Sequence, residues 1–223
     1  MQTFDTPTPI STVLDIPAGQ IRFIAADRTD TTVEVLPADS SKSRDVKMAE
    51  QTTVEYGDGV LRIGASAKNQ YFGPSGSLEV TVQLPAGSRV DAKAASAELR
   101  GVGRLGDVAF EGAHGSVKLD EAASVRLTTS AGDVTIGRLT GPAEISIAKG
   151  DIQITEAVHG AVVLRTQSGD VSVGAAPGVS ASLDAGTTYG RIRNALNNTE
   201  RRQRRTDHPR EYLLRRHRRP QPL

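Results

Sequence analysis

A short sequence motif that repeats along the second half of the chain limits what the chain can fold into. One row of segments begins with a small residue every 17 to 21 residues: AELRG from Ala97, GSVKL from Gly115, GDVTI from Gly132, GDIQI from Gly150, GDVSV from Gly169 and GRIRN from Gly190. A second row lies between them: GDVAF from Gly106, ASVRL from Ala123, GPAEISI from Gly141, GAVVL from Gly160 and GVSASL from Gly178. Self-similarity at a nearly fixed period is typical of a solenoid.

Each segment alternates apolar and polar residues, as Val134, Thr135 and Ile136 do. Successive side chains of a strand point to opposite faces, so the apolar residues share one interior and Thr135 faces water. Such short strands bury their apolar faces only when neighbouring coils stack on one another. The pattern therefore predicts an all-β fold, a β-solenoid with two strands in each coil of about 18 residues, over residues 95–198.

Glycine opens most segments, and we expect it at the corners of the coils. A corner needs a tight bend or a positive φ, which residues with a Cβ resist. The aspartate that often follows is expected to fix the turn by accepting a hydrogen bond from a backbone amide two residues on.

The first half reads as a different module, residues 1–94, antiparallel and capping one end of the solenoid. A cap is needed because a terminal coil otherwise exposes unpaired strand edges. Gly57-Asp58-Gly59 predicts a hairpin, Pro17–Gly19 a bend, residues 73–76 a turn and residues 39–44 a polar loop. The expected strands are 21–24, 33–36, 54–56, 60–63 and 78–84.

Several segments in their order along the chain resemble a large bacterial family, the putative-adhesin β-strand-repeat proteins of unknown function. They are FDTPTPI from Phe4, Pro-Ala-Gly from Pro17, VTVQLPAGSRV from Val80, SGDV from Ser168 and LDAGTTYGRIRN from Leu183. The resemblance extends from about Phe4 to Asn197. It implies an all-β repeat fold without an established enzymatic activity.

The charge is divided between the body and the end of the chain. Glu200–Leu223 contains nine arginines and three acidic residues, a net charge of +6, which leaves −5 for residues 1–199. An acidic body with 4% aromatic residues argues against specific nucleic-acid binding.

Residues 199–223 have two interpretations. One is a basic arm for an anionic partner, with Tyr212–Leu214 as an apolar anchor. The other is a disordered extension read out of frame, which translation of the other two frames would test.

Candidate sites in the body have weak support. Asp133, Asp151 and Asp170 occupy equivalent positions, continued by Glu98, Ser116 and Arg191. Stacked carboxylates can bind Ca²⁺, but the G-G-x-G-x-D spacing of calcium solenoids is missing, so turn-forming aspartates are favoured. His114 and His159 precede glycines of different rows and are not expected to share a metal. GVGRLG at Gly101–Gly106 resembles a spaced-glycine loop of the kind that binds nucleotides, but it lies between two expected solenoid strands and no helix is expected after it.

No residue is therefore predicted to be catalytic, cofactor-binding or metal-ligating. The chain contains no cysteine, no G-x-S-x-G elbow and no G-x-x-x-x-G-K-[ST] loop. Glycan enzymes of solenoid fold usually expose aromatic residues, and Tyr71-Phe72 is the only adjacent aromatic pair. We expect the protein not to be an enzyme and to need no cofactor.

The predicted function is a non-enzymatic β-repeat scaffold or interaction module. Its expected partner is unknown, a protein or a cell-envelope component. The alternative is a carbohydrate- or polyanion-binding protein that uses a solenoid face or the basic tail. A stripe of Tyr, Asn and Asp would favour glycans, whereas the outward residues read as the scattered polar set Thr135, Gln153, Ser172, Ser146 and Ser180. The N-terminus resembles no secretory signal and no stretch resembles a membrane helix, so a cytoplasmic location is expected.

Overall fold

The structure is a computed structural model that describes residues 1–65, 76–176, 181–182, 189–194 and 215–216. Sixteen strands and one helix fall within these ranges. Tyr71-Phe72, Ser180, most of the 73–76 turn and all of the tail except Arg215–Arg216 lie outside them.

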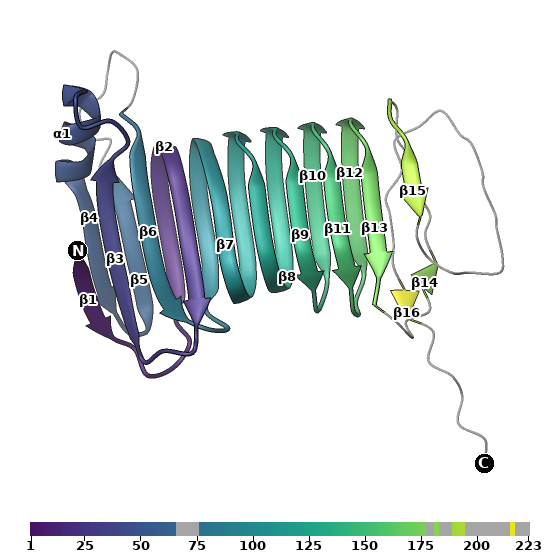
Figure 1. The fold of residues 1–223 in the computed structure, drawn as a ribbon, viewed down its shortest axis with the longest axis horizontal. Coiled ribbons are helices and arrows are strands. Elements are labelled where there is room, and N and C mark those ends of the chain that lie inside the picture. Colours follow the sequence, from purple (N-terminus) through teal and green to yellow (C-terminus); the bar gives the residue numbers. More distant parts are fainter. Residues whose placement is uncertain (66–75, 177–180, 183–188, 195–214, 217–223) are drawn as a thin grey trace.

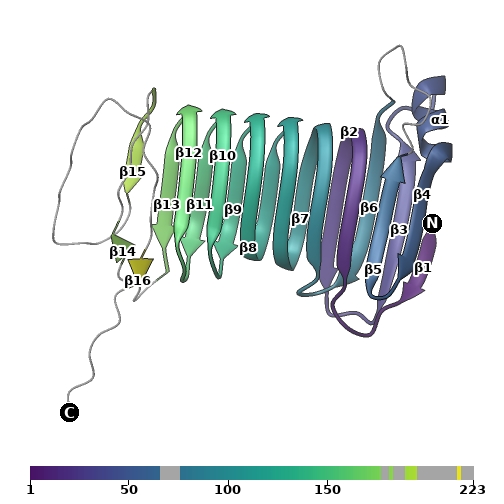
Figure 2. The same ribbon diagram turned by 180° about the vertical axis from the view of Figure 1, so that it is seen from behind.

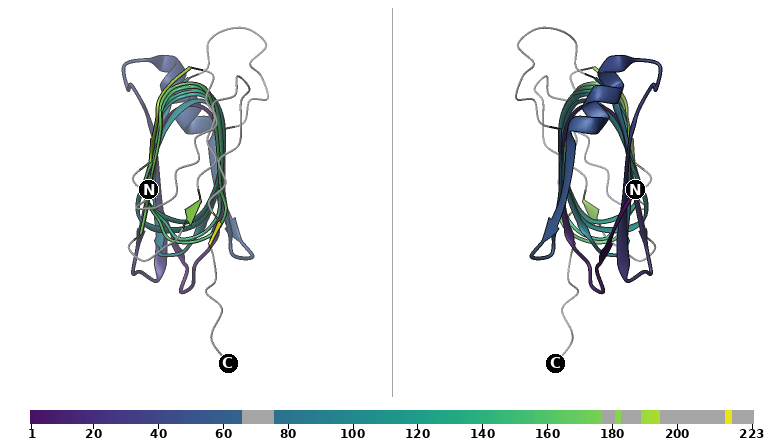
Figure 3. Two further views of the ribbon diagram at one scale, coloured as in Figure 1. Left: turned by 90° about the vertical axis from the view of Figure 1, so that its right-hand side faces the viewer. Right: turned by 90° about the vertical axis from the view of Figure 1, so that its left-hand side faces the viewer.

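The chain winds into a flattened tube whose coils stack along one axis (Figure 1 and Figure 2). Seen down that axis, successive coils superpose as a narrow oval with two long sides (Figure 3). We call these sides the first face and the second face. The predicted β-solenoid is confirmed.

The first face contains β6 (Leu78–Pro85), the second half of β2 (Ser11–Ala26), the middle of β7 (Arg89–His114), the first half of β8 (Val117–Ala131), β9 (Val134–Leu139), β11 (Ile152–Ala157), β13 (Val171–Ala175) and β15 (Ile192–Asn194). The second face contains β4 (Thr52–Gly57), β5 (Val60–Ala65), the first half of β2, the two ends of β7, the second half of β8, β10 (Ala143–Lys149) and β12 (Val162–Ser168). Long strands such as β2, β7 and β8 bend around a corner and contribute to both faces (Figure 1). Outside the two faces, β14 (Ala181–Ser182) pairs with β16 (Arg215–Arg216).

The repeated segments lie side by side in parallel register, as the period requires. Val134, Ile152 and Val171 are Cα partners in successive coils, and Val171 is followed by Ile192. The side chains of Val134, Ile152 and Val171 point inward and are at most 2% exposed. Similar inward rows on both faces form one continuous core of Val, Ile, Leu and Ala with Phe23 and Phe110.

The corners before β9, β11 and β13 contain the expected glycines in a conformation that other residues rarely adopt. Gly132, Gly150 and Gly169 have φ of 137°, 140° and 152°. A Cβ on Gly150 would lie 2.3 Å from the carbonyl oxygen of Gly132, and one on Gly169 would lie 1.9 Å from that of Gly150. The glycines therefore allow successive backbones to stack at the corner.

The N-terminal part combines antiparallel and parallel pairings. β1 (Gln2–Asp5) pairs antiparallel with β3 (Asp30–Pro37), β3 with β6, and β4 with β5. However, β2 pairs in parallel with β5, β6 and β7, so β2 already belongs to a coil of the solenoid. The Gly57–Gly59 hairpin is confirmed, with positive φ at both Asp58 (52°) and Gly59 (72°), as a type I′ turn requires.

Helix α1 (Ser43–Gln51) replaces the end of the expected polar loop and was not predicted. It lies at the N-terminal end of the tube (Figure 3). Met48 is buried in the core, and the buried Asp45 carboxylate accepts a hydrogen bond from the Ser77 amide at 3.0 Å. Phe4 and Tyr56 pack nearby with ring centroids 5.4 Å apart. Helix and aromatic pair together cover the end of the core.

Candidate functional site

The three equivalent aspartates form an acidic row, Asp133, Asp151 and Asp170, at one corner of the solenoid. The Asp151 amide donates to Asp133 Oδ1 at 2.9 Å, and the Asp170 amide donates to Asp151 Oδ1 at 2.7 Å. The Arg191 amide continues the series on Asp170 Oδ1 at 2.7 Å. Each carboxylate thus fixes the next coil, instead of accepting from an amide two residues on in its own turn as expected. Backbone N–H donors offset part of the negative charge of the row.

The described residues contain no group of three or more His, Cys, Asp or Glu side chains arranged to hold a metal ion. His114 ends β7 at the corner that leads to Gly115, whereas His159 lies at the opposite corner, between β11 and β12. The two histidines belong to different corners, as their positions in the repeat predicted.

Charged side chains on the faces pair between neighbouring coils. Partners are 18 to 20 residues apart: Lys93–Glu111 at 3.2 Å, Arg100–Asp120 at 2.7 Å, Arg126–Glu144 at 3.9 Å and Arg138–Glu156 at 3.7 Å. Exposed pairs of this kind contribute little stability each. Their arrangement shows that opposite charges usually stand next to each other along the stack.

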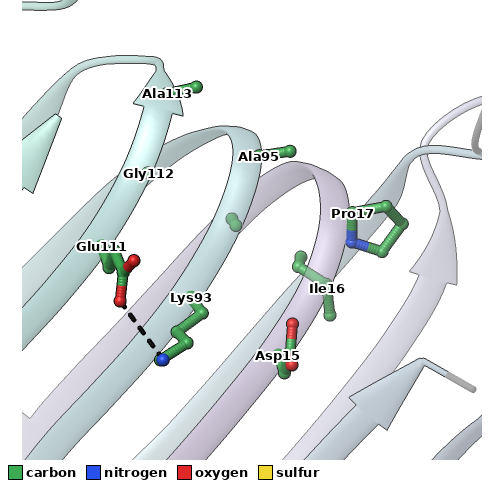
Figure 4. A pocket seen from close by; sticks show the side chains of 9 residues that line it. Asp15, Ile16, Pro17, Lys93, Ala95, Glu111, Gly112 and Ala113 are labelled. Carbon is green, nitrogen blue, oxygen red and sulfur yellow. Dashed lines mark ion pairs between the residues drawn. The ribbon is translucent and has the colours of Figure 1, made fainter. Parts of the chain in front are cut away.

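A shallow depression of about 410 Å³ lies where β2 and two segments of β7 run side by side (Figure 4). Lys93 and Glu111 lie on neighbouring segments, and Asp15 follows on β2 (Figure 4). Hydrogen bonding to Glu111 is the main cause that raises the pKa of Lys93, and the Glu111 charge adds to it. The remaining lining is Ile16, Pro17, Ala94, Ala95, Gly112 and Ala113.

This depression lacks the features of an acid–base centre. The Lys93 and Glu111 side chains are 60% and 68% exposed. A catalytic acid or base is usually tuned by burial in a concave site from which water is excluded. Lys93 is instead held in its charged form by an exposed partner.

A second candidate is a basic row on the first face, formed by Arg22, Arg100 and Lys118. These residues are Cα partners on β2, β7 and β8, and their side chains point outward between buried neighbours. Arg100 Nη2 contacts Asp120 Oδ1 at 2.7 Å, while Nη1 is buried without a hydrogen-bond partner. Arg22 and Lys118 are exposed.

The basic row lies next to a bulge in the pairing of β7 with β8. The register shifts between Gly101 and Arg104, and Asp120 Oδ2 accepts a hydrogen bond from the Gly103 amide at 3.2 Å. This is the GVGRLG segment, and it lies within β7 with no helix after it, as expected. Bulges are over-represented near functional sites because they redirect side chains.

Sequence reasoning missed the basic row. Arg100 and Lys118 belong to recognised repeats, but Arg22 lies 78 residues before Arg100 and was assigned to the separate module. The similarity of AGQIRF (18–23) to SAELRG (96–101) is the signal that could have placed it.

These observations define a β-solenoid whose polar surface is arranged in rows across coils. The sequence profile of the Toastrack DUF4097 family matches residues 13–211, and the chain belongs to this family. No curated protein matches. No helix among the described residues is long and apolar enough to span a membrane.

Solved structures with some similarity come from Bacteroidetes. A putative adhesin from Parabacteroides distasonis is 16% identical with a TM-score of 0.39, over 76% of this chain and 67% of its own. A putative adhesin from Bacteroides fragilis is 12% identical with a TM-score of 0.40, over 86% and 90%. A putative lipid binding protein from Parabacteroides distasonis is 10% identical with a TM-score of 0.37, over 86% and 92%.

Proposed function

We propose that the protein is a non-enzymatic interaction scaffold that presents the two flat faces of its solenoid to a partner, a protein or a cell-envelope component. The observation that supports this role is the use of polar groups between coils. Aspartate carboxylates accept amides of the next coil, and charged side chains pair across coils. Polar groups of this kind stabilise a regular and rigid surface, which lowers the ordering cost of binding.

The outward residues of the first face favour this role over glycan binding. Thr135, Gln153 and Ser172 form one row across β9, β11 and β13, and Ser146 lies outward on the second face. The row contains no aromatic side chain for stacking on a sugar ring. Small polar side chains on a flat sheet are suited to contacts with another macromolecule.

The experiment compares capture of partners by the two faces. The full-length chain and two variants, Gln153→Lys on the first face and Ser146→Lys on the second, are used as bait in a lysate of the source organism, with captured proteins identified by mass spectrometry. Both replacements add one positive charge at an outward position, so each is the control for the other.

We expect one variant to lose a specific partner that the other retains, while circular dichroism stays unchanged in both. Equal capture by all three baits would contradict the proposal, and so would substrate turnover by the purified chain.

A further inference from the structure

We propose that the basic row of Arg22, Arg100 and Lys118 binds a linear phosphate polymer that lies along the solenoid axis. This inference rests on the proposed scaffold role, because it names the chemistry that one face of the scaffold recognises.

The first step of the argument is the arrangement of charges in the row. Three cations stand at paired positions on adjacent strands, about 4.8 Å apart from one strand to the next. Like charges directly opposite each other destabilise a sheet. Elsewhere on the described faces, Lys93, Arg126 and Arg138 each face a carboxylate on the neighbouring coil. In the basic row only Arg100 faces such a carboxylate, that of Asp120, whereas Arg22 and Lys118 lie next to another cation instead.

The second step is that the charge of the row is only partly offset. Arg22 and Lys118 make no ion pair with any residue that the structure describes. Arg100 pairs with Asp120, but its Nη1 remains without a hydrogen-bond partner. The acidic row is also like-charged, yet it receives three backbone N–H groups. Unfavourable arrangements such as adjacent like charges, when little in the structure compensates them, are expected at functional sites.

The third step concerns the shape of the ligand. The three cations extend over about 10 Å in a straight line. Phosphate groups match both the planar fork of arginine and the point charge of lysine. A chain with recurring phosphates can contact all three side chains, whereas a single orthophosphate can contact only one or two.

The surroundings of the row favour a narrow chain over a membrane surface. Glu98 lies two residues before Arg100 on the same outward side, and the equivalent positions in the following coils are Ser116 and then the acidic row at the corner. Two residues along a strand correspond to about 6.6 Å. A broad anionic surface would meet these carboxylates together with the basic row, but a chain parallel to the axis can follow the three cations and avoid Glu98 and the acidic row.

The test uses the purified full-length chain and long-chain inorganic polyphosphate, with binding measured by isothermal titration calorimetry at several salt concentrations. The variant is Arg22→Gln with Lys118→Gln. The matched control is Arg62→Gln with Lys47→Gln, which removes one exposed arginine and one exposed lysine from β5 and α1. Both variants retain the arginine-rich tail, so its contribution to binding is the same in each.

We expect the row variant to bind polyphosphate roughly tenfold more weakly than the control, because two solvent-exposed ion contacts together contribute about 1.4 kcal/mol. The wild-type affinity should fall steeply with salt. An equal effect of both variants, or none, would overturn the proposal, because binding would then come from the tail or from overall charge. Row-dependent binding to phosphatidylglycerol vesicles without binding to polyphosphate would also overturn it, in favour of a membrane surface.

Failure of this test can be distinguished from failure of the scaffold role. The titration uses a defined probe and requires no cellular partner. A chain that ignores polyphosphate can still capture a protein with one of its faces, and a chain without a protein partner can still bind polyphosphate.

Discussion

Replacing single glycines with alanine separates the two reasons for which the solenoid uses glycine, a positive φ and the close approach of a neighbouring backbone. Three positions form a graded series. Gly57 lies outside the positive-φ region, and nothing lies within 4 Å of the place that an added Cβ would take. Gly59 has a φ of 72° in equally open space, and Gly150 has a φ of 140° with the Gly132 carbonyl oxygen 2.3 Å from the new Cβ.

The expected losses follow from these environments. Gly57→Ala should leave the free energy of unfolding unchanged or raise it by up to about 1 kcal/mol, because alanine lowers the entropy of the unfolded chain. Gly59→Ala should lose about 1–2 kcal/mol from backbone strain. Gly150→Ala combines strain of about 1–3 kcal/mol with a steric overlap that costs about 1–3 kcal/mol more.

The assay is urea unfolding followed by far-UV circular dichroism, with the three variants and the wild type measured side by side. The urea midpoint should be highest for Gly57→Ala, lower for Gly59→Ala and lowest for Gly150→Ala. The free energy of unfolding of Gly150→Ala should be at least about 2 kcal/mol below that of the wild type. A Gly150→Ala variant within about 0.5 kcal/mol of Gly59→Ala would refute the reasoning, because the carbonyl contact would then have no cost.

Three further perturbations test other parts of the structure. Ile152→Asp should unfold several coils together, because the side chain is 1% exposed and a buried charge is costly; a native melting temperature would contradict this register. Asp151→Ala should lower the free energy of unfolding by about 0.5–1.5 kcal/mol, and Asp151→Asn should lower it less, since an amide oxygen can still accept a hydrogen bond from the Asp170 N–H. Thermal melts of both variants measure this, and equal losses would count against the role of the acidic row in joining the coils. A hydrogen bond from the Ser41 hydroxyl, followed by one from Lys42, lowers the pKa of Asp39 to about 2. The stabilisation that the ionised Asp39 carboxylate gives the folded chain is therefore complete above its ordinary pKa near 4 and is lost as pH falls towards 2. An NMR titration of the Asp39 carboxyl carbon should show the lowered pKa, and an ordinary pKa would disprove it.

The sequence was sufficient for the solenoid because its coils are consecutive. GDVTI, GDIQI and GDVSV bring Val134, Ile152 and Val171 into register with one period, and a local pattern contains that information. The glycines at the corners follow from the same repeat.

The N-terminal part could not be predicted to the same depth. A long insertion separates β2 from its neighbour β7, so the period is interrupted and the parallel pairing of Gly19 with Ala97 is not visible locally. The nine-residue helix α1 has few apolar residues, and its position depends on tertiary contacts of Asp45 and Met48. Tertiary packing usually decides whether so short a helix forms.

The candidate basic row depends on that hidden register. Only when β2 lies beside β7 do Arg22, Arg100 and Lys118 become neighbours. The acidic row was visible in the repeat, but the donor to each carboxylate lies in the next coil and could not be read from one segment.

The most direct test of the parallel stack is a methyl NOESY spectrum of the chain with labelled Val and Ile side chains. The structure predicts cross-peaks between Val134 and Ile152 and between Ile152 and Val171, which are Cα partners about 4.8 Å apart. It predicts much weaker contact between Val134 and Val171, which are two coils apart. Strong contacts between Val134 and Val171, or none from Ile152 to either, would contradict the fold and every inference drawn from it.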